Sequence, residues 1–339
     1  MSRATEAESI AEFWRWWTTT GGATVASAIE GKRPAAIAGE VSAQVHALHP
    51  DLAWETAAGD LTRHLLVVTA AGDGAVRALA RRWLLAAPAS DDTWSYADLR
   101  QPLLDPGTGS LVVAGEAIDF ARTVVGARAV GNHLDVTVQH PAFAALGEDD
   151  RLQAAYLVLD AVAGEEAVEC WLGEIAASTI APLDAFPVQH LGGFVRSFAR
   201  ERQDDEGNPQ WVLLRGTGPA GPVMALALST LSCVIAPLFD THVAIDLPYA
   251  GRTAEELPDP LALESLRTIE DRLVDRLGAA GLLVAAETSA GVRRLHFYVE
   301  TDGAGAGLLA AQADSWGDGT ADVTVTADPG WGEVAHLRS

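Results

Sequence analysis

LALESLRTIEDRLVDRLGAAGLLVAAETSAGVRRLHFYVETDGAGAGLLAAQADSWGDGTADVTVTADPGW (Leu261–Trp331) is the stretch around which the rest of the chain is arranged. It begins with a predicted helix, because large aliphatic residues recur at the spacing of one helix face: Leu266, Ile269, Leu273 and Leu277. Asp259 and Pro260 suit the start of this helix, since Asp accepts unpaired backbone N–H groups and Pro fits the first turn. Gly278 can end the helix with a positive φ angle.

Strands are predicted on either side of this helix. Along Arg293–Glu300, Leu295, Phe297 and Val299 alternate with Arg294, His296 and Tyr298, which indicates one buried and one wet face. Further strands are predicted at 242–249, 282–287 and 322–327, and a short helix at 308–316. The resulting order is βαββαβ, the ferredoxin-like split βαβ arrangement. Its antiparallel sheet carries both helices on one face and leaves the other face open to a partner, a second domain or water.

Four short motifs in this region are similar to the bacterial domain-of-unknown-function family 695. They are SLRTIEDRL (Ser265–Leu273), ETSAG (Glu287–Gly291), RRLHFYV (Arg293–Val299) and DPGW (Asp328–Trp331). The resemblance covers about residues 211–333. It implies a fold and a bacterial origin; because the family has no established catalytic residues, it implies no reaction.

The first half of the chain repeats the same order of elements. Residues 34–100 predict helix, strand, strand, helix and strand (αββαβ), and ETAAG at Glu55–Gly59 parallels ETSAG at Glu287–Gly291. Duplication explains this repeat, and so do two ordinary uses of a common fold. A ββαβ unit is predicted over 116–176, and it can share one sheet with the first unit. Its predicted elements are strands near 118–125 and 133–140, a helix at 149–163 and a strand at 168–175.

An amphipathic helix is predicted at residues 9–17, with Ser9 and Glu12 in a capping-box pattern. Its tryptophans would form a costly patch if exposed, so we expect the helix to dock on the protein. A membrane-surface helix is disfavoured, because the acidic polar face would be repelled by anionic lipid. Residues 18–31 are expected to form a loop or hairpin.

The sequence as a whole predicts an α+β protein built of repeated ferredoxin-like units (βαββαβ and αββαβ) with antiparallel sheets. We expect two main domains: residues 1–180, which hold the amphipathic helix and the first two units, and residues 208–335, which form the C-terminal ferredoxin-like domain. The stretch 181–207 contains Pro182, Pro187 and a charged run that ends at Gly207, and it is expected to be the linker.

Composition narrows the possible functions. The 339 residues are 49% hydrophobic, which is enough to bury substantial cores. A net charge of −23 argues against direct binding to nucleic acid and fits a protein partner, for instance a basic one. Cys170 and Cys233 are too few for a disulfide framework.

The apolar run 222–239 is long enough for a membrane span, but its polar residues and Pro237 favour a buried strand followed by a loop. Without an apolar segment near the N-terminus, the expected location is the cytoplasm. The oligomeric state is left open.

No cofactor or metal site is predicted. The chain contains none of the common nucleotide-binding, nucleophile-elbow or zinc motifs. The glycines at 303, 305 and 307 miss the dinucleotide spacing and stand beside acidic residues, so they predict a turn. The pair His46 and His49, and polar residues on one strand face (Asp240, His242, Asp246), match metal-ligand types, but solvent-facing helices and strands show the same patterns.

The leading functional hypothesis is a non-enzymatic regulatory or protein-interaction protein of the bacterial cytoplasm. The alternative is an enzyme or small-molecule-binding protein with a site between the two domains, because pockets favour such interfaces. The predicted partner-binding residues are Arg294, His296, Tyr298 and Trp331, since arginine and aromatic side chains are favoured at interfaces. The competing interpretation is that these residues pack against the N-terminal half.

Overall fold

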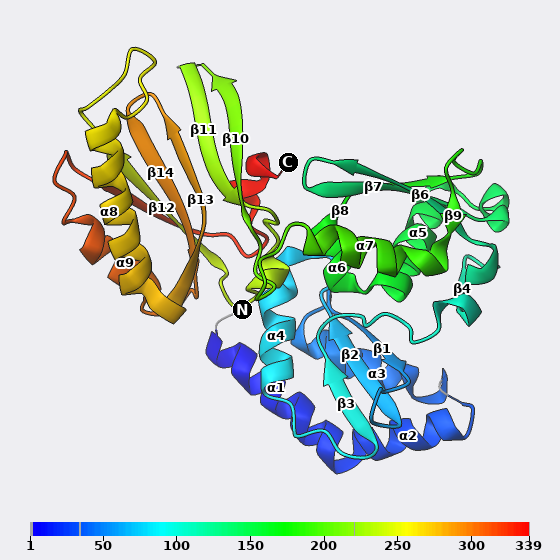
Figure 1. The fold of residues 1–339 in the computed structure, drawn as a ribbon. Helices are drawn as coiled ribbons and strands as arrows, with labels where there is room; N and C mark the ends of the chain where they lie inside the picture. The colour runs from blue at the N-terminus through cyan, green and yellow to red at the C-terminus, as the bar shows by residue number, and fades with distance from the viewer. Residues whose placement is uncertain (1–2, 34, 220, 339) are drawn as a thin grey trace. The chain divides into compact units, whose positions relative to one another are not determined.

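The computed structural model describes residues 3–33, 35–219 and 221–338. The chain divides into two compact units, Met1–Ser197 and Phe198–Ser339 (Figure 1). The division falls within the stretch 181–207 that the sequence marks as a linker. This stretch is not irregular throughout, however, because helix α7 (Leu191–Arg200) runs across the point of division.

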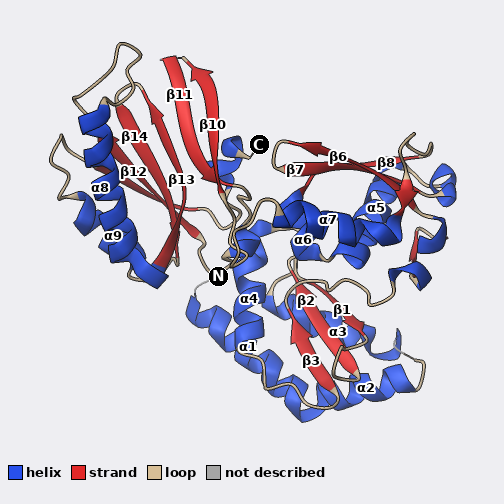
Figure 2. Ribbon diagram, in the orientation of Figure 1, coloured by secondary structure: helices blue, strands red, loops and turns tan. Residues whose placement is uncertain are grey.

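Unit 1 contains two sheets and a hairpin (Figure 2). Its helices are α1 (Arg3–Trp16), the π-helix η1 (Trp17–Gly21), α2 (Gly22–Glu30), α3 (Ala35–Leu48), α4 (Arg77–Leu85), α5 (Glu148–Ala163), α6 (Glu165–Trp171) and α7. Its strands are β1 (Ala53–Ala57), β2 (His64–Thr69), β3 (Trp94–Ala97), β4 (Ser110–Val113), β5 (Glu116–Asp119), β6 (Val124–Val130), β7 (His133–Gln139), β8 (Leu172–Ser178) and β9 (Phe186–Pro187).

The first sheet has the order β1-β2-β3, with β1 antiparallel and β3 parallel to β2. Helices α1 to α4 bury their apolar faces in one core with this sheet. The expected docking of the N-terminal helix is confirmed, because Phe13, Trp14 and Trp17 are buried and the Trp14 ring stacks on Trp83 with centroids 4.7 Å apart. The capping-box prediction at Ser9 is wrong: α1 already begins at Arg3, and the Ser9 hydroxyl donates to the Thr5 carbonyl.

Two further predictions for unit 1 are wrong. Residues 17–30 are helical rather than a loop, since η1 and α2 continue the chain from α1. The strand expected at 168–175 starts only at Leu172, because α6 precedes it. Gly164 ends α5 with φ 88°, and Glu165 and Glu166 then occupy the first turn of α6, where carboxylates favour the helix dipole.

The second sheet of unit 1 has the order β8-β7-β6-β9 and shares no strand with the first, so the αββαβ and ββαβ segments do not form the common sheet that the sequence left possible. The segment expected as a strand near 118–125 is β5, a short 3₁₀ turn (Phe120–Arg122) and the start of β6. β5 pairs with β4 in a separate hairpin. The sheet is mixed, because β7 and β8 run parallel, joined through α5 and α6.

Unit 2 is built on one six-stranded antiparallel sheet with the order β10-β11-β13-β14-β12-β15. Its strands are β10 (Trp211–Gly218), β11 (Gly221–Leu228), β12 (Thr241–Pro248), β13 (Gly281–Ser289), β14 (Val292–Val299) and β15 (Asp322–Ala327). Its helices are α8 (Pro260–Leu277) and α9 (Gly305–Ala313). The predicted helix face is confirmed: Leu266, Ile269, Leu273 and Leu277 are buried against Val243, Leu295 and Phe297 of the sheet.

The two αββαβ segments have the same order of elements but different sheets. In unit 2, β12 lies between the parallel strands β14 and β15. In unit 1, β2 and β3 pair directly, and helical segments stand before the first strand in place of a counterpart to β12. The similarity between ETAAG and ETSAG therefore reflects matching hairpin positions within sheets of different topology.

The apolar run 222–239 contains β11, followed by a loop with a short 3₁₀ turn at Cys233–Ile235. Among the described residues, no helix is long and apolar enough to cross a membrane.

Candidate functional site

The sheet face opposite α8 and α9 carries the residues that the sequence predicts for partner binding. Three of them are not exposed: Tyr298 and Trp331 are 0% exposed and His296 is 3% exposed. Tyr298 and Trp331 form a second core of unit 2 with Val334 and Leu337 of the C-terminal segment and with residues of β11 and β13. The His296 ring lies 6.3 Å from the ring of His336 in the same segment. Contacts within unit 2 therefore cover this part of the face, so it is not the open surface that the strand alternation indicates.

The C-terminal segment, residues 328–338, is held against β14 by contacts among Tyr298, Asp328 and Trp331. The Tyr298 hydroxyl donates to Asp328 at 2.5 Å, and its ring stacks on Trp331 with centroids 4.3 Å apart. Asp328 also accepts the backbone N–H groups of Gly332 and Glu333. Burial and the neighbouring Asp328 raise the pKa of Tyr298, so its proton is held for this bond. These contacts give Tyr298 and Trp331 a structural role.

Four polar side chains form a continuous hydrogen-bonded chain beside this contact, which we call the histidine chain: His242, His296, Glu287 and His336. Nε2 of His242 lies 3.0 Å from Nδ1 of His296, and Nε2 of His296 lies 2.9 Å from Glu287 Oε1. Nε2 of His336 reaches the same oxygen at 2.9 Å. Strands β12, β13 and β14 position the first three residues, since His242, His296 and Glu287 lie on neighbouring strands of the sheet.

Two members of the histidine chain, His242 and Glu287, have strongly lowered pKa values, but for different physical reasons. Burial, reinforced by His296, lowers the pKa of His242 to about 4, so this imidazole is neutral at pH 7. The hydrogen bond from His296 lowers the pKa of Glu287 to about 2, against the opposing effect of burial, and His336 adds to this lowering. His336 is more than half exposed, so this end of the histidine chain is open to solvent, whereas His242 at the other end is buried.

Arg294 is the one predicted residue that remains exposed, with 52% of its side chain accessible. Its guanidinium forms a two-point ion pair with Asp246 of β12, with N–O distances of 2.6 and 2.7 Å. Exposed pairs of this kind contribute at most about 1 kcal/mol. The guanidinium of Arg294 is therefore already paired within unit 2.

The residues weighed as metal ligands or as a phosphate site have other contacts. His242 is in the histidine chain, Asp246 pairs with Arg294, and Asp240 accepts the backbone N–H of Thr301. In the described part of the chain, no group of three or more His, Cys, Asp or Glu side chains is arranged to hold a metal ion. Gly305 lies at the start of α9, where it allows close packing against the Ala280 carbonyl and Val299.

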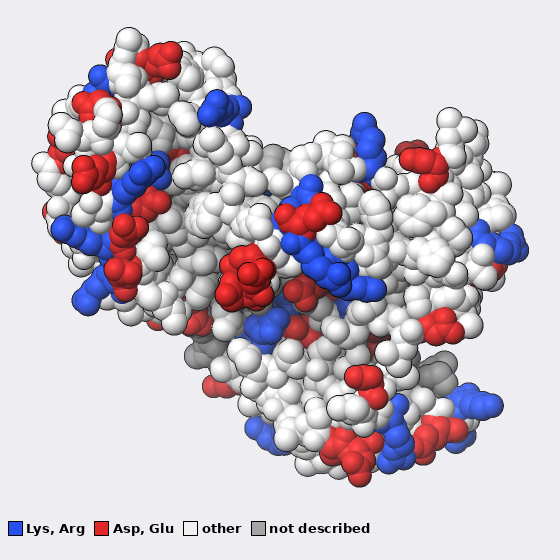
Figure 3. Space-filling model, viewed as in Figure 1, with Lys and Arg blue, Asp and Glu red and all other residues white. Residues whose placement is uncertain are grey.

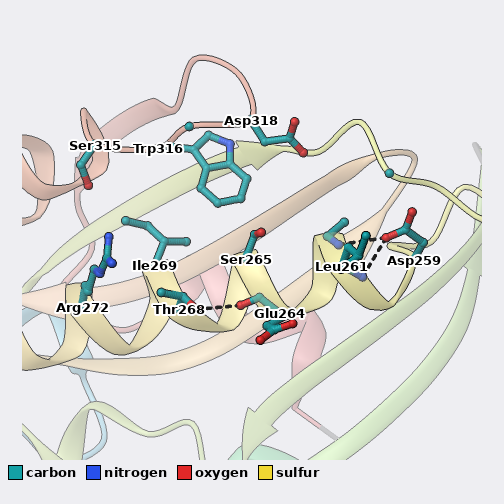
Figure 4. Close-up of a pocket in the computed structure, with 13 residues that line it drawn as sticks. Asp259, Leu261, Glu264, Ser265, Thr268, Ile269, Arg272, Ser315, Trp316 and Asp318 are labelled. Atoms are coloured by element: carbon teal, nitrogen blue, oxygen red, sulfur yellow. Dashed lines mark hydrogen bonds between the residues drawn. The ribbon is translucent and has the colours of Figure 1, made fainter.

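A groove of about 760 Å³ opens on the other side of unit 2, between α8 and the loop that follows α9 (Figure 4). Trp316 and Ile269 form its apolar middle. Arg272 lies at one end and Asp259 and Asp318 at the other, with Ser265 and Thr268 along α8. The Trp316 indole is held by its N–H bond to the Pro248 carbonyl, and Asp318 accepts the backbone N–H of Ala250. The side chain of Leu261 is 76% exposed at the groove.

The groove is acidic, because the carboxylates of Asp259, Glu264 and Asp318 outnumber the single guanidinium of Arg272. Elsewhere on α8, acidic and basic side chains are interspersed on the face shown in Figure 3. The sequence alone did not indicate this site. The polar face of α8 can be read from it, but only the folded chain brings WGDG (Trp316–Gly319) beside that face.

No family model matches the sequence, and no curated protein or solved structure is significantly similar to the chain.

Proposed function

We propose that the chain is a non-enzymatic interaction protein whose unit 2 binds a basic segment of a partner protein in the groove between α8 and the loop at 315–318. The observation that carries this proposal is the excess of carboxylates around an apolar floor: Asp259, Glu264 and Asp318 around Trp316 and Ile269. An arginine or lysine would lie at the Asp259–Asp318 end, and an apolar neighbour would contact Trp316 and Leu261.

Two finer assignments belong to the same proposal. We propose that residues 241–327 form a ferredoxin-like unit, which the strand order β13-β14-β12-β15 and the shared core of α8 and α9 support. We also propose membership of the bacterial family 695 for residues 211–333 and a location in the bacterial cytoplasm. Both proposals rest on the sequence motifs and composition. A fold of this kind hosts many functions, so the groove carries the functional argument.

The test uses labelled peptides and fluorescence anisotropy. A peptide in which arginine alternates with leucine is compared with one in which glutamate replaces each arginine. We expect only the basic peptide to bind, with affinity that falls as salt is raised. The double substitution Glu264→Gln and Asp318→Asn should weaken binding about tenfold, since it removes two charges that contact the peptide.

The control is the double substitution Asp271→Asn and Asp275→Asn, which removes the same charge from exposed positions of the same helix outside the groove. It should change affinity less than about twofold. Melting temperatures show whether each variant is folded. An equal loss in both double variants would mean attraction to net charge alone, and that result, or no binding of the basic peptide, would overturn the proposal.

A further inference from the structure

Unit 1 contains a concave site that the proposed function does not use. A cavity of about 520 Å³, within the usual size range for small-molecule sites, lies between the first sheet, α5 and the loop that follows β3. Its walls are mainly apolar and come from segments far apart in the sequence, including Leu65, Leu111, Phe120 and Leu157. The Leu103 N–H donates to the Ala161 carbonyl at 2.8 Å and so ties the loop to α5.

Charged groups are concentrated at one end of this cavity. Nε of Arg100 pairs with Glu55 Oε2, and its Nη1 with Asp160 Oδ2, each at 3.1 Å. The backbone N–H of Arg100 donates to Glu165, whose other oxygen accepts the Thr69 hydroxyl. Three carboxylates therefore surround one guanidinium, which leaves an excess of negative charge beside the apolar walls.

Two carboxylates line the cavity, Glu55 and Asp105. Both oxygens of Asp105 already accept hydrogen bonds, from Gly107 and Thr108, so Glu55 is the carboxylate with an oxygen left for a ligand. It lines the cavity with 43% of its side chain exposed, whereas Asp160 is 9% exposed and Glu165 is buried. Arg100 engages only Oε2 of Glu55, and within the described residues no hydrogen bond is formed by Oε1. An acceptor with negative charge thus faces a space otherwise bounded largely by hydrocarbon.

We infer that this cavity binds a small apolar amine, with the ammonium group on Glu55 Oε1 and the hydrocarbon body between Leu65, Leu111, Phe120 and Leu157. A charged donor on the ligand pairs with this carboxylate through a charge-assisted hydrogen bond, which is stronger than a bond between neutral groups. A carboxylate or phosphate of the same size would face Glu55 and Asp105, while the charge of Arg100 is already offset by Glu55 and Asp160, so repulsion disfavours anions. The apolar body displaces water from the cavity walls.

The experiment measures binding of hexylamine, hexanoate and hexanol to the full chain by calorimetry, because the three probes share one hydrocarbon body. We expect hexylammonium to bind at least about tenfold more tightly than hexanoate, with hexanol between them. Glu55→Gln should weaken hexylammonium about tenfold and leave hexanol nearly unchanged, since it removes the charge and keeps the shape.

Two further variants separate this site from general attraction of cations to an acidic protein. Ala58→Trp places a large side chain at an exposed position that lines the cavity, and should abolish binding of all three probes. Glu116→Gln removes one charge from unit 1 outside the cavity and should have no effect. If hexanoate binds as tightly as hexylammonium, if Ala58→Trp binds normally while folded, or if the native chain binds none of the probes at millimolar concentration, the inference is wrong.

Discussion

Trp331 shows at the scale of single residues how the chain end stabilises unit 2. It is fully buried, stacks on Tyr298 and donates its indole N–H to the Phe239 carbonyl at 2.9 Å. Its backbone adopts a left-handed conformation (φ 56°), which costs a bulky residue on the order of 1 kcal/mol or more. The chain tolerates this cost because the ring packs in the same core as Tyr298 of β14 and Val334 and Leu337 of the 3₁₀ segment Gly332–Leu337.

Replacing Trp331 by alanine should therefore lower the free energy of unfolding by about 3–5 kcal/mol, through the cavity and the lost indole bond. Urea unfolding measures this change. Trp211→Ala is the control in the same unit, because that indole is 47% exposed on β10 and should cost less than about 1 kcal/mol. Equal losses in the two variants would show that Trp331 does not fasten the chain end.

At the scale of elements, the glycines before and within α9 have distinct roles that their regular spacing conceals. A Cβ on Gly305 would lie 2.7 Å from the Ala280 carbonyl oxygen and 2.7 Å from Val299 Cγ1. A Cβ on Gly307 would meet nothing within 4 Å. Gly305 is required by the close packing of α9 on the sheet, whereas Gly307 can be replaced without a clash.

We accordingly expect opposite effects from two matched substitutions. Gly307→Ala should stabilise the protein by up to about 1 kcal/mol, because alanine loses less backbone entropy than glycine in a helix. Gly305→Ala should destabilise it by about 1–3 kcal/mol, because α9 and β14 must move apart. Thermal unfolding of the two variants beside the native protein checks both signs, and a stabilising Gly305→Ala would contradict the packing argument.

On the scale of the whole molecule, the two units hold ionisable groups with opposite pKa shifts. In unit 1, burial and the neighbouring Glu165 raise the pKa of Asp160 to about 6 and of Glu169 to about 7. In unit 2, burial and His296 lower the pKa of His242 to about 4. Asp160 and Glu169 make native unit 1 bind more protons than its unfolded form, an effect that the lowered pKa of buried His140 partly offsets, whereas His242 makes native unit 2 bind fewer.

Lowering the pH from 7 to 5 should thus stabilise unit 1 and destabilise unit 2, each by an amount on the order of 2 kcal/mol. The gain in unit 1 develops as pH falls through 7 and 6. The stability that neutral His242 gives unit 2 is present above about pH 6.5 and is lost as pH falls toward 4. Below about pH 4.5, Glu287 extends this loss. It takes up a proton in the unfolded chain, whereas the folded chain, in which its pKa is about 2, still holds it ionised.

The buried thiols of Cys170 and Cys233 report on one unit each. Their labelling by a pyridyl disulfide along a urea series at pH 7 and pH 5 gives a midpoint for each unit. We expect the Cys170 midpoint to rise and the Cys233 midpoint to fall. In Glu169→Gln the rise should be smaller, since one of the two titrating groups is gone. Midpoints that move together would contradict the prediction.

The sequence by itself determined the elements whose residues follow one local period. The spacing of Leu266, Ile269, Leu273 and Leu277 determines the buried face of α8. The alternation along Arg293–Glu300 determines which side chains of β14 lie on each face of the sheet. The aromatic stripe of α1 likewise required a buried partner surface. Each of these follows from the geometry of a helix or strand and needs only neighbouring residues.

Only the tertiary structure decided what covers each face and which strands pair. The alternation marks His296 and Tyr298 as lying on the face opposite the helices, but the segment that buries them comes much later in the sequence, at the end of the chain. In the same way, Glu165 at the start of α6 contacts Thr69 and Arg100, which are distant in the sequence. The acidic groove and the Glu55 cavity are also assembled from separate segments. Local periodicity reports the direction of a side chain, whereas burial and electrostatic environment depend on contacts that exist only once the chain has folded.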